Sequence, residues 1–150
     1  MSLNWPKAGA NYVPAYQISG IPYVTRSAAG EITTTAVKVS FPYVTRFFVV
    51  GNNSLGDLRV GFTENGVSAT ETANYFKVKP FTSGAIRYEV RCKELWFRND
   101  DNANAGFEIM AGLTNVHADQ FPVLSGALYT YGFESAQNNG VVTSSWPGVG

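Results

Sequence analysis

The chain has 150 residues, of which 45% are hydrophobic and 15% are charged, and its formal net charge is zero. This length is typical of one domain that can build a core without disulfides. Zero net charge gives no broad attraction to nucleic acid or anionic membranes, so we expect no direct nucleic-acid partner. No apolar run approaches the ~20 residues that span a bilayer, so we expect no membrane span.

Residues 1–16 are predicted to form an extended N-terminal arm. The opening residues lack the basic and apolar regions of a secretory signal, so we expect no such signal there. Pro6 and Pro14 fix φ and remove amide donors, and the apolar residues of the segment follow neither a helical nor a strand period. Because a disordered tail would contain fewer aromatic residues, we expect the arm to lie on its own domain or on a neighbouring copy.

Eight segments between residues 17 and 128 are predicted to be strands. They are short and apolar, several alternate between apolar and polar residues, and Gly, Pro, Asn or Asp bounds them. The Asn-Gly pair at residues 65–66 predicts a tight turn, and residues 67–73 are predicted to be a polar loop. The predicted strands cover residues 17–26, 33–39, 43–50, 58–62, 74–78, 86–98, 107–113 and 121–128, the first being interrupted at Gly20 and Pro22.

The strongest strand pattern covers residues 86–98. Ile86, Val90 and Cys92 fall on one face of this strand, but at Leu95 the apolar residues move to the other parity. A period of two cannot shift without an extra residue, so a bulge or bend is predicted near residues 93–94. The same alternation predicts that Cys92 is a buried and unreactive thiol.

The pentapeptide Pro-Tyr-Val-Thr-Arg occurs twice, at residues 22–26 and at residues 42–46. Two copies are too few for a solenoid, which needs at least three repeats. Because Pro at the first residue of a strand removes no ladder hydrogen bond, we predict that both copies begin strands in similar surroundings. A duplicated ligand motif is the alternative.

Residues 129–150 are predicted to form an extended C-terminal arm in which Gly, Ser, Asn and Thr dominate. Aromatic residues gather in both arms, and such side chains are enriched in protein interfaces because they bury a large area with few torsions to freeze. The alternative is that the arms cover the edges of their own sheets. The residues predicted to contact other subunits are Trp5, Tyr12, Tyr16, Tyr131, Phe133 and Trp146.

Groups that could support chemistry are sparse. His117 is predicted to be a solvated imidazole in a loop, and a single His cannot supply the several ligands of a cupin-type metal site. The loop of Asp100, Asp101, Asn102 and Asn104 is rich in oxygen atoms, but its adjacent carboxylates lack the spacing of a calcium site. We therefore expect no catalytic residue, no metal and no cofactor, and we do not expect an enzyme.

Together the elements predict an all-β fold. Eight antiparallel strands without an amphipathic helix are the pattern of a single jelly roll, in which two sheets pack against each other. The predicted organisation is an extended arm over residues 1–16, a jelly-roll domain over residues 17–128 and an extended arm over residues 129–150.

Six segments, taken in chain order, carry a further likeness; they are residues 11–25, 41–45, 58–63, 94–98, 107–114 and 121–124. In style and order they resemble the small single jelly-roll structural proteins of large icosahedral double-stranded DNA viruses, and the penton and minor capsid class in particular. The resemblance covers most of residues 11–134. It includes no diagnostic motif, so no functional residue carries over.

The resemblance implies a capsid subunit that assembles through its barrel walls and terminal arms. Its expected partners are copies of itself, as a pentamer if it stands at a vertex, and other capsid proteins. Its expected location is the virion, assembled in the cytoplasm of the host cell. The alternative is a carbohydrate-binding module of the lectin type, because exposed aromatic rings also stack on sugars.

Overall fold

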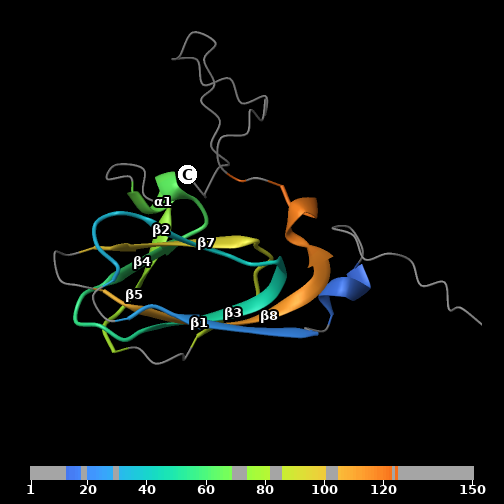
Figure 1. The fold of residues 1–150 in the computed structure, drawn as a ribbon, viewed down its shortest axis with the longest axis horizontal. Helices are drawn as coiled ribbons and strands as arrows, with labels where there is room; N and C mark the ends of the chain where they lie inside the picture. Colours follow the sequence, from blue (N-terminus) through green and yellow to red (C-terminus); the bar gives the residue numbers. More distant parts are fainter. Residues whose placement is uncertain are drawn as a thin grey trace, which may run out of the picture.

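The computed structural model describes residues 13–17, 20–28, 31–68, 74–81, 86–100, 105–122 and 124. They form an all-β sandwich of two four-stranded antiparallel sheets that face each other (Figure 1). The strand order is β1-β8-β3-β6 in the first sheet and β2-β7-β4-β5 in the second. The strands are β1 (Ile21–Arg26), β2 (Val37–Ser40), β3 (Tyr43–Asn52), β4 (Leu58–Gly61), β5 (Tyr75–Val78), β6 (Arg87–Tyr88), β7 (Glu94–Asn99) and β8 (Phe107–His117).

The strands pair in a nested order along the chain. β1 pairs with β8, β2 with β7, β3 with β6 and β4 with β5, so the second half of the chain runs back along the first half. Two more ladders, β3 with β8 and β4 with β7, join these pairs into the two sheets. Among consecutive strands only β4 and β5 share a sheet, so the chain alternates between the two layers elsewhere.

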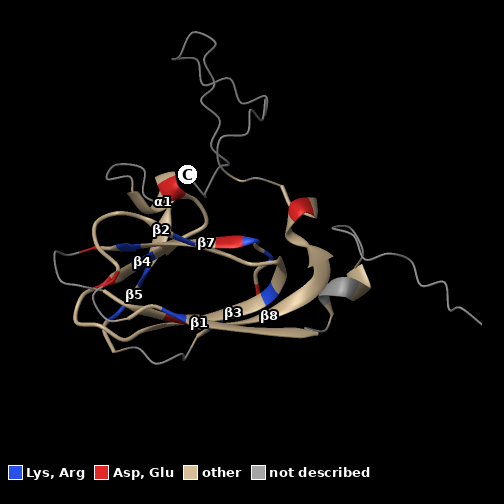
Figure 2. Cartoon of the chain, in the orientation of Figure 1, with Lys and Arg blue, Asp and Glu red and all other residues tan. Residues whose placement is uncertain are grey.

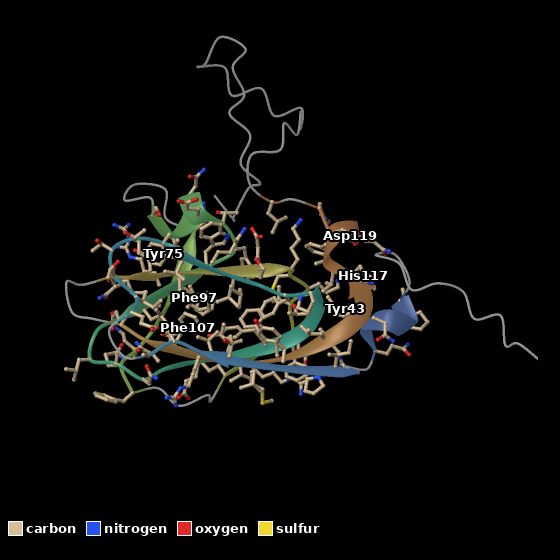
Figure 3. All side chains as sticks on the ribbon, in the orientation of Figure 1. Tyr43, Tyr75, Phe97, Phe107, His117 and Asp119 are labelled. Carbon is tan, nitrogen blue, oxygen red and sulfur yellow. The ribbon has the colours of Figure 1, made fainter. Side chains whose placement is uncertain are left out.

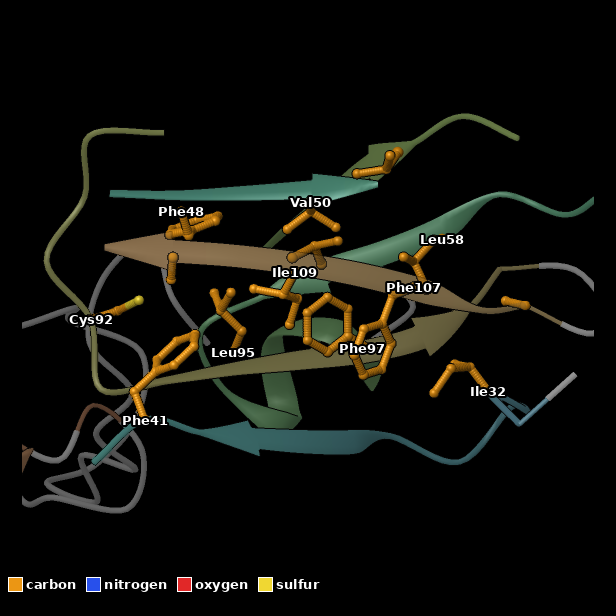
Figure 4. Close-up of a cluster of buried hydrophobic side chains, with 14 of the residues drawn as sticks. Ile32, Phe41, Phe48, Val50, Leu58, Cys92, Leu95, Phe97, Phe107 and Ile109 are labelled. Atoms are coloured by element: carbon orange, nitrogen blue, oxygen red, sulfur yellow. The ribbon is translucent and has the colours of Figure 1, made fainter. Parts of the chain in front are cut away.

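The core lies between the sheets and follows the alternation of side chains along the strands. Phe97 on β7 and Phe107 on β8 come from opposite sheets, and their rings stack with centroids 4.3 Å apart and 17° between their planes (Figure 3). The strand predicted over residues 107–113 is confirmed, and in β8 it continues to His117. Figure 4 shows the surrounding side chains, which include Ile32, Phe41, Phe48, Val50, Leu58, Cys92, Leu95 and Ile109.

The tight turn predicted after β4 is wrong, because the short helix α1 (Glu64–Ser68) takes its place. The Thr63 hydroxyl accepts the amide hydrogen of Gly66 at 3.0 Å and so caps the start of the helix. Val67, predicted to begin a polar loop, is completely buried. A Cβ atom at Gly61 on β4 would lie 2.7 Å from the Val67 Cγ1 atom, so the missing side chain makes room for α1 on the second sheet.

The strand predicted over residues 86–98 is two strands in different sheets. β6 pairs with β3 in the first sheet, whereas β7 pairs with β2 and β4 in the second. A bend does lie at Lys93, but it belongs to a crossover between the sheets and not to one continuous ladder. Ile86 and Val90 lie outside the two-residue strand β6, one on each side of it, and both are exposed, whereas Cys92 is buried as predicted.

The limits of three other predicted strands also differ from the structure. β1 begins at Ile21 instead of residue 17. Of the second predicted strand, residues 33–39, only residues 37–39 join a ladder, in the strand β2 that continues to Ser40. After β8 the chain forms the 3-10 helix η2 (Ala118–Gln120), and Phe121 and Pro122 are not in a strand. Residues 123 and 125–128 lie outside the described residues. The expected count of eight strands is met because β6 and β7 replace one predicted strand.

The predicted terminal arms fall almost wholly outside the described residues. Of residues 1–16 the structure describes only Val13–Tyr16, which form the 3-10 helix η1 and not an extended chain. Residues 129–150 are all outside the described part. The helices that the structure does describe are all too short to cross a membrane.

The two Pro-Tyr-Val-Thr-Arg copies both lie at strands, but their surroundings are not similar. The first copy fills β1 almost completely, and its Val24 is 76% exposed. The second copy starts just before β3, and its Val44 is fully buried. The flanking apolar residues set which face of a strand meets the core, so identical pentapeptides can present opposite faces.

Candidate subunit-contact surface

The structure does not test the contact residues predicted in the arms. The described residues do not include Trp5, Tyr12, Tyr131, Phe133 or Trp146, and Tyr16 is described only by its backbone in η1. These six assignments remain predictions. A contact surface can therefore be sought only on the described strands.

The outward surface of the first sheet carries a continuous stripe of apolar residues. The strand register aligns Val24 on β1, Met110 on β8 and Val49 on β3 in one row across the sheet. A second row lies two residues further along the same three strands. We call the members of both rows the outer stripe; they are Pro22, Val24, Phe47, Val49, Met110 and Gly112.

The outer stripe is open to solvent at its centre. Val24 is 76% exposed and Met110 is 52% exposed. An antiparallel sheet that packs one face on a core usually carries polar side chains on its other face. Figure 2 shows that charged residues are few along β1 and β8 compared with the second sheet. Contiguous exposed apolar side chains of this kind mark interaction sites.

Charged side chains of both signs border the outer stripe. At one end, Arg26 on β1 lies opposite Glu108 on β8, and both side chains are exposed. On the β6 side, the Arg87 guanidinium carbon lies 3.7 Å from the centroid of the Phe47 ring. Arg87 also forms a salt bridge of 2.6 Å with Glu89. An apolar centre with a polar rim is the usual composition of a protein interface.

Sequence reasoning missed the outer stripe, although the alternation of β8 contains a signal for it. If Ile109 and Leu113 point inward, Met110 must point outward, and an apolar residue at an outward position is informative. For Val24, the repeated pentapeptide gives no such signal, because the Val of one copy is exposed and the Val of the other is buried. Neither residue is aromatic, so a search for exposed aromatic residues passes over both.

The outward surface of the second sheet is charged, and its charges are satisfied within the chain. The Asp100 carboxylate forms ion pairs with Arg59 and Lys77. The Arg59 guanidinium carbon also lies 4.4 Å from the centroid of the Tyr75 ring. Asp100 is the one described member of the predicted oxygen-rich loop, and both of its oxygens are engaged by cations, so it is not available as a calcium ligand.

Two arginines of this surface hold α1 against the second sheet. Arg59 donates to the Val67 carbonyl oxygen at 3.3 Å, and Arg98 donates to the Ser68 carbonyl oxygen at 2.8 Å. Both carbonyls are at the C-terminal end of α1, where the last carbonyl groups of a helix lack partners within the helix. The second sheet is thus partly covered by its own chain, which leaves the outer stripe as the open apolar surface among the described strands.

Asp100→Asn is expected to make the free energy of unfolding depend less on pH on the acid side of neutrality. The hydrogen bond from Lys77 and then that from Arg59 hold the pKa of Asp100 below its usual value. A lowered pKa contributes stability that is present above about pH 4, the unfolded pKa, and is lost as the pH falls toward the folded pKa. Chemical denaturation from about pH 6 to about pH 2 should therefore show a smaller decline in the free energy of unfolding for Asp100→Asn than for the wild type.

The matched control for this prediction is Asp119→Asn, which removes an exposed carboxylate from η2. The same pairing raises the pKa of Lys77, first through its hydrogen bond to Asp100. A raised pKa contributes stability below the unfolded pKa and loses it as the pH rises through the folded pKa, so Lys77→Gln should change the alkaline limb. It should also reduce the decline on the acid side, because it removes the first cause of the lowered pKa of Asp100. Identical acid limbs for Asp100→Asn and the wild type would contradict the assignment.

The two side chains with reactive groups, Cys92 and His117, are placed differently from each other. Burial raises the pKa of the Cys92 thiol to about 12, which keeps it protonated and agrees with the predicted unreactive cysteine. His117 is exposed, as predicted, but it ends β8 and does not lie in a loop. Its ring centroid is 4.7 Å from that of Tyr43 (Figure 3).

Among the described residues no group of three His, Cys, Asp or Glu side chains could hold a metal ion.

Comparison with known proteins gives no match for this chain. No protein-family model matches it, and no curated protein or solved structure is similar to it. A functional proposal has to start from the strand pairing and from the surfaces of the chain itself.

Proposed function

We propose that this chain is a structural subunit of an icosahedral viral capsid, of the penton or minor capsid class, built on a single jelly roll. The observation that carries the proposal is the nested strand pairing. A jelly roll consists of eight strands in two sheets with Greek-key connections. When a long antiparallel ribbon is rolled up in this way, its first strand pairs with its last, as β1 pairs with β8. The orders β1-β8-β3-β6 and β2-β7-β4-β5 support this assignment.

The segments that resemble capsid proteins also fall mainly on this strand framework. Residues 58–63 contain β4, residues 94–98 lie in β7, and residues 107–114 lie in β8. The likeness therefore follows the strands that build the core and not a single loop. Because one fold can host many functions, the proposal needs evidence from assembly.

The proposed mechanism is geometric. In a sandwich whose sheets lie about 10 Å apart, the outer faces and the edges of the two sheets are the walls of the domain, and these walls are the surfaces that contact neighbouring subunits. Head-to-tail contacts between such walls close into a ring around a symmetry axis. The net charge of zero leaves copies without long-range repulsion.

The role in a capsid is tested in cells that naturally produce the chain. We expect to recover it in the particle fraction, protected together with other shell proteins, and to lose it from that fraction when the particles are dissociated. Mass spectrometry of the purified particles measures its copy number relative to the other shell proteins. Recovery of the chain only outside the particles would overturn the proposal.

Deletion of residues 1–16 is expected to leave a folded domain that fails to assemble. The described part of this segment is η1, and the strands of both sheets start after it. Circular dichroism and thermal unfolding should therefore stay close to the wild type, while native mass and electron microscopy should show loss of oligomers. Deletion of residues 1–4, which retains Trp5, is the matched control and should assemble normally. Normal assembly of the longer deletion would contradict the role of the N-terminal arm.

No described contact favours the carbohydrate-binding alternative. Its calcium version relies on the loop that starts at Asp100, and the Asp100 carboxylate is already paired with Arg59 and Lys77. Its aromatic version relies on Trp5 and Trp146, which are outside the described residues. Binding on a glycan array that is lost on substitution of these two residues would revive this alternative.

A further inference from the structure

We infer that the part of the outer stripe on β1 and β8 is the contact surface for the same two strands of a second copy, about a two-fold axis that runs between β1 and β8 and parallel to them. The inference deepens the proposed function, since it takes a second copy of the chain as the partner. Its support is the register of β1 against β8, which makes this face complementary to itself.

The register of β1 against β8 determines which residues of the two copies would face each other across such an axis. Rotation about a line midway between β1 and β8 places β1 of one copy over β8 of the other at the same height along the strands. Each residue of β1 then faces the residue that is its own cross-strand neighbour on β8. The contact is therefore isologous, with residue i on residue j and residue j on residue i.

The opposed residues complement one another in size and in polarity. Val24 would face Met110, so two exposed apolar side chains of the stripe would cover each other. Pro22 would lie over Gly112, which is buried and adds no side chain of its own to the contact. Two sheets packed in this manner lie about 10 Å apart with their strands within about 30° of parallel, which keeps these pairs within reach.

The charges at the end of the stripe complement one another in the same rotation. Arg26 lies beside Glu108 within the chain, so Arg26 of one copy would face Glu108 of the other, twice by symmetry. Both side chains are exposed, and within the part of the chain that the structure describes neither forms a salt bridge. They are thus available for a partner. A surface that carried one sign of charge here would repel its own copy.

The area of the stripe sets the expected strength of the contact. The two strands that overlap across this axis, β1 and β8, and about six residues of length cover roughly 200 Å² of each copy. Stable interfaces bury about 800 Å² per partner, so the contact is a weak one between two isolated copies. Weak contacts of this kind become effective when other contacts hold many copies together, as in a shell.

The first experiment introduces a charge into the stripe. Val24→Asp and Met110→Asp are each expected to weaken self-association about a hundredfold, because the two-fold axis presents each buried carboxylate twice. Leu55→Asp is the matched control, since Leu55 is 77% exposed in the loop between β3 and β4, outside the stripe. Sedimentation at increasing protein concentration measures association, and circular dichroism verifies that each variant is folded. Association of Val24→Asp equal to that of Leu55→Asp would overturn the inference.

The second experiment tests the axis itself. Arg26→Glu alone and Glu108→Arg alone should each weaken association, because each homodimer would oppose like charges twice. An equal mixture of the two variants should associate again, because both intermolecular pairs then join opposite charges. Within each chain the cross-strand pair still carries like charges, so repair inside a chain cannot explain the rescue. A mixture no stronger than the single variants would exclude the proposed two-fold.

These outcomes separate this inference from the proposed function. If the wild type associates and the mixture is rescued, but the chain is absent from particles, the contact stands and the capsid role fails. If the chain is found in particles and Val24→Asp assembles normally, the capsid role stands and the contact fails. A wild type that remains monomeric up to its solubility limit overturns the inference directly.

Discussion

Phe97→Ala is expected to lower the free energy of unfolding by about 3–5 kcal/mol. Phe97 is fully buried on β7, and its ring stacks on Phe107 of the opposite sheet. Alanine would remove apolar area from the core and leave a cavity between two rigid sheets that cannot collapse around it. Denaturant titration should show a lower midpoint with an unchanged slope, since the native fold is retained.

The contribution of the ring pair itself is measured by a double-mutant cycle. Phe107→Ala and the double variant complete the cycle, and a coupling of about 0.5–1.5 kcal/mol is expected from the stacked rings. Met110→Ala is the control, because Met110 lies on the same strand but points outward and should cost less than about 1 kcal/mol. Strictly additive losses would show that the two sheets are not joined through this pair.

Most of the strands could be predicted because their patterns are local. β3, β4, β5 and β8 each alternate or carry β-branched runs, and each is close to its predicted range. The inward face of β8 follows from the same period of two. Strand existence depends on neighbouring residues in the sequence, so the sequence alone is sufficient for it.

The errors occur where distant residues decide the structure. The helix α1 replaces a turn because Gly61, on the preceding strand, leaves space that Val67 fills. The two Pro-Tyr-Val-Thr-Arg copies differ because their flanks set opposite faces. Neither outcome can be read from the local pattern, since each depends on packing between elements.

The candidate surface differs from the predicted one for a related reason. A search for aromatic residues leads to the terminal arms, whereas the outer stripe consists mainly of aliphatic side chains aligned by strand register. Register between β1 and β8 is a tertiary property, so the juxtaposition of Val24 with Met110 and of Arg26 with Glu108 could not be seen in the sequence. What the sequence did contain is the outward parity of Met110.

Thr45→Val is expected to lower the free energy of unfolding by about 2–3 kcal/mol although the side chain keeps its shape. The Thr45 hydroxyl donates to the Val90 carbonyl oxygen at 2.8 Å and accepts the Cys92 amide hydrogen at 2.9 Å. Valine leaves both backbone groups without their partner, at about 1–3 kcal/mol for each group that stays dry. Thr45 lies where the register between β3 and β8 shifts, opposite the segment that crosses from β6 to β7. Its hydroxyl therefore holds the segment that joins β6 to β7, where the strand predicted over residues 86–98 is divided.

The same substitution should change the chemistry of Cys92 if the hydroxyl holds the crossover in place. Cys92 is buried beside Thr45, with the hydroxyl oxygen 3.3 Å from the Cys92 Sγ atom. Loosening of the crossover in Thr45→Val exposes the thiol, so its reaction with a disulfide reagent should accelerate. Thr45→Ser, which keeps the hydroxyl and removes a methyl group, should cost only about 1 kcal/mol and leave the thiol slow. If Thr45→Val and Thr45→Ser lost equal stability and their thiols reacted at equal rates, the methyl group of Thr45, and not its hydrogen bonds, would hold the crossover between β6 and β7.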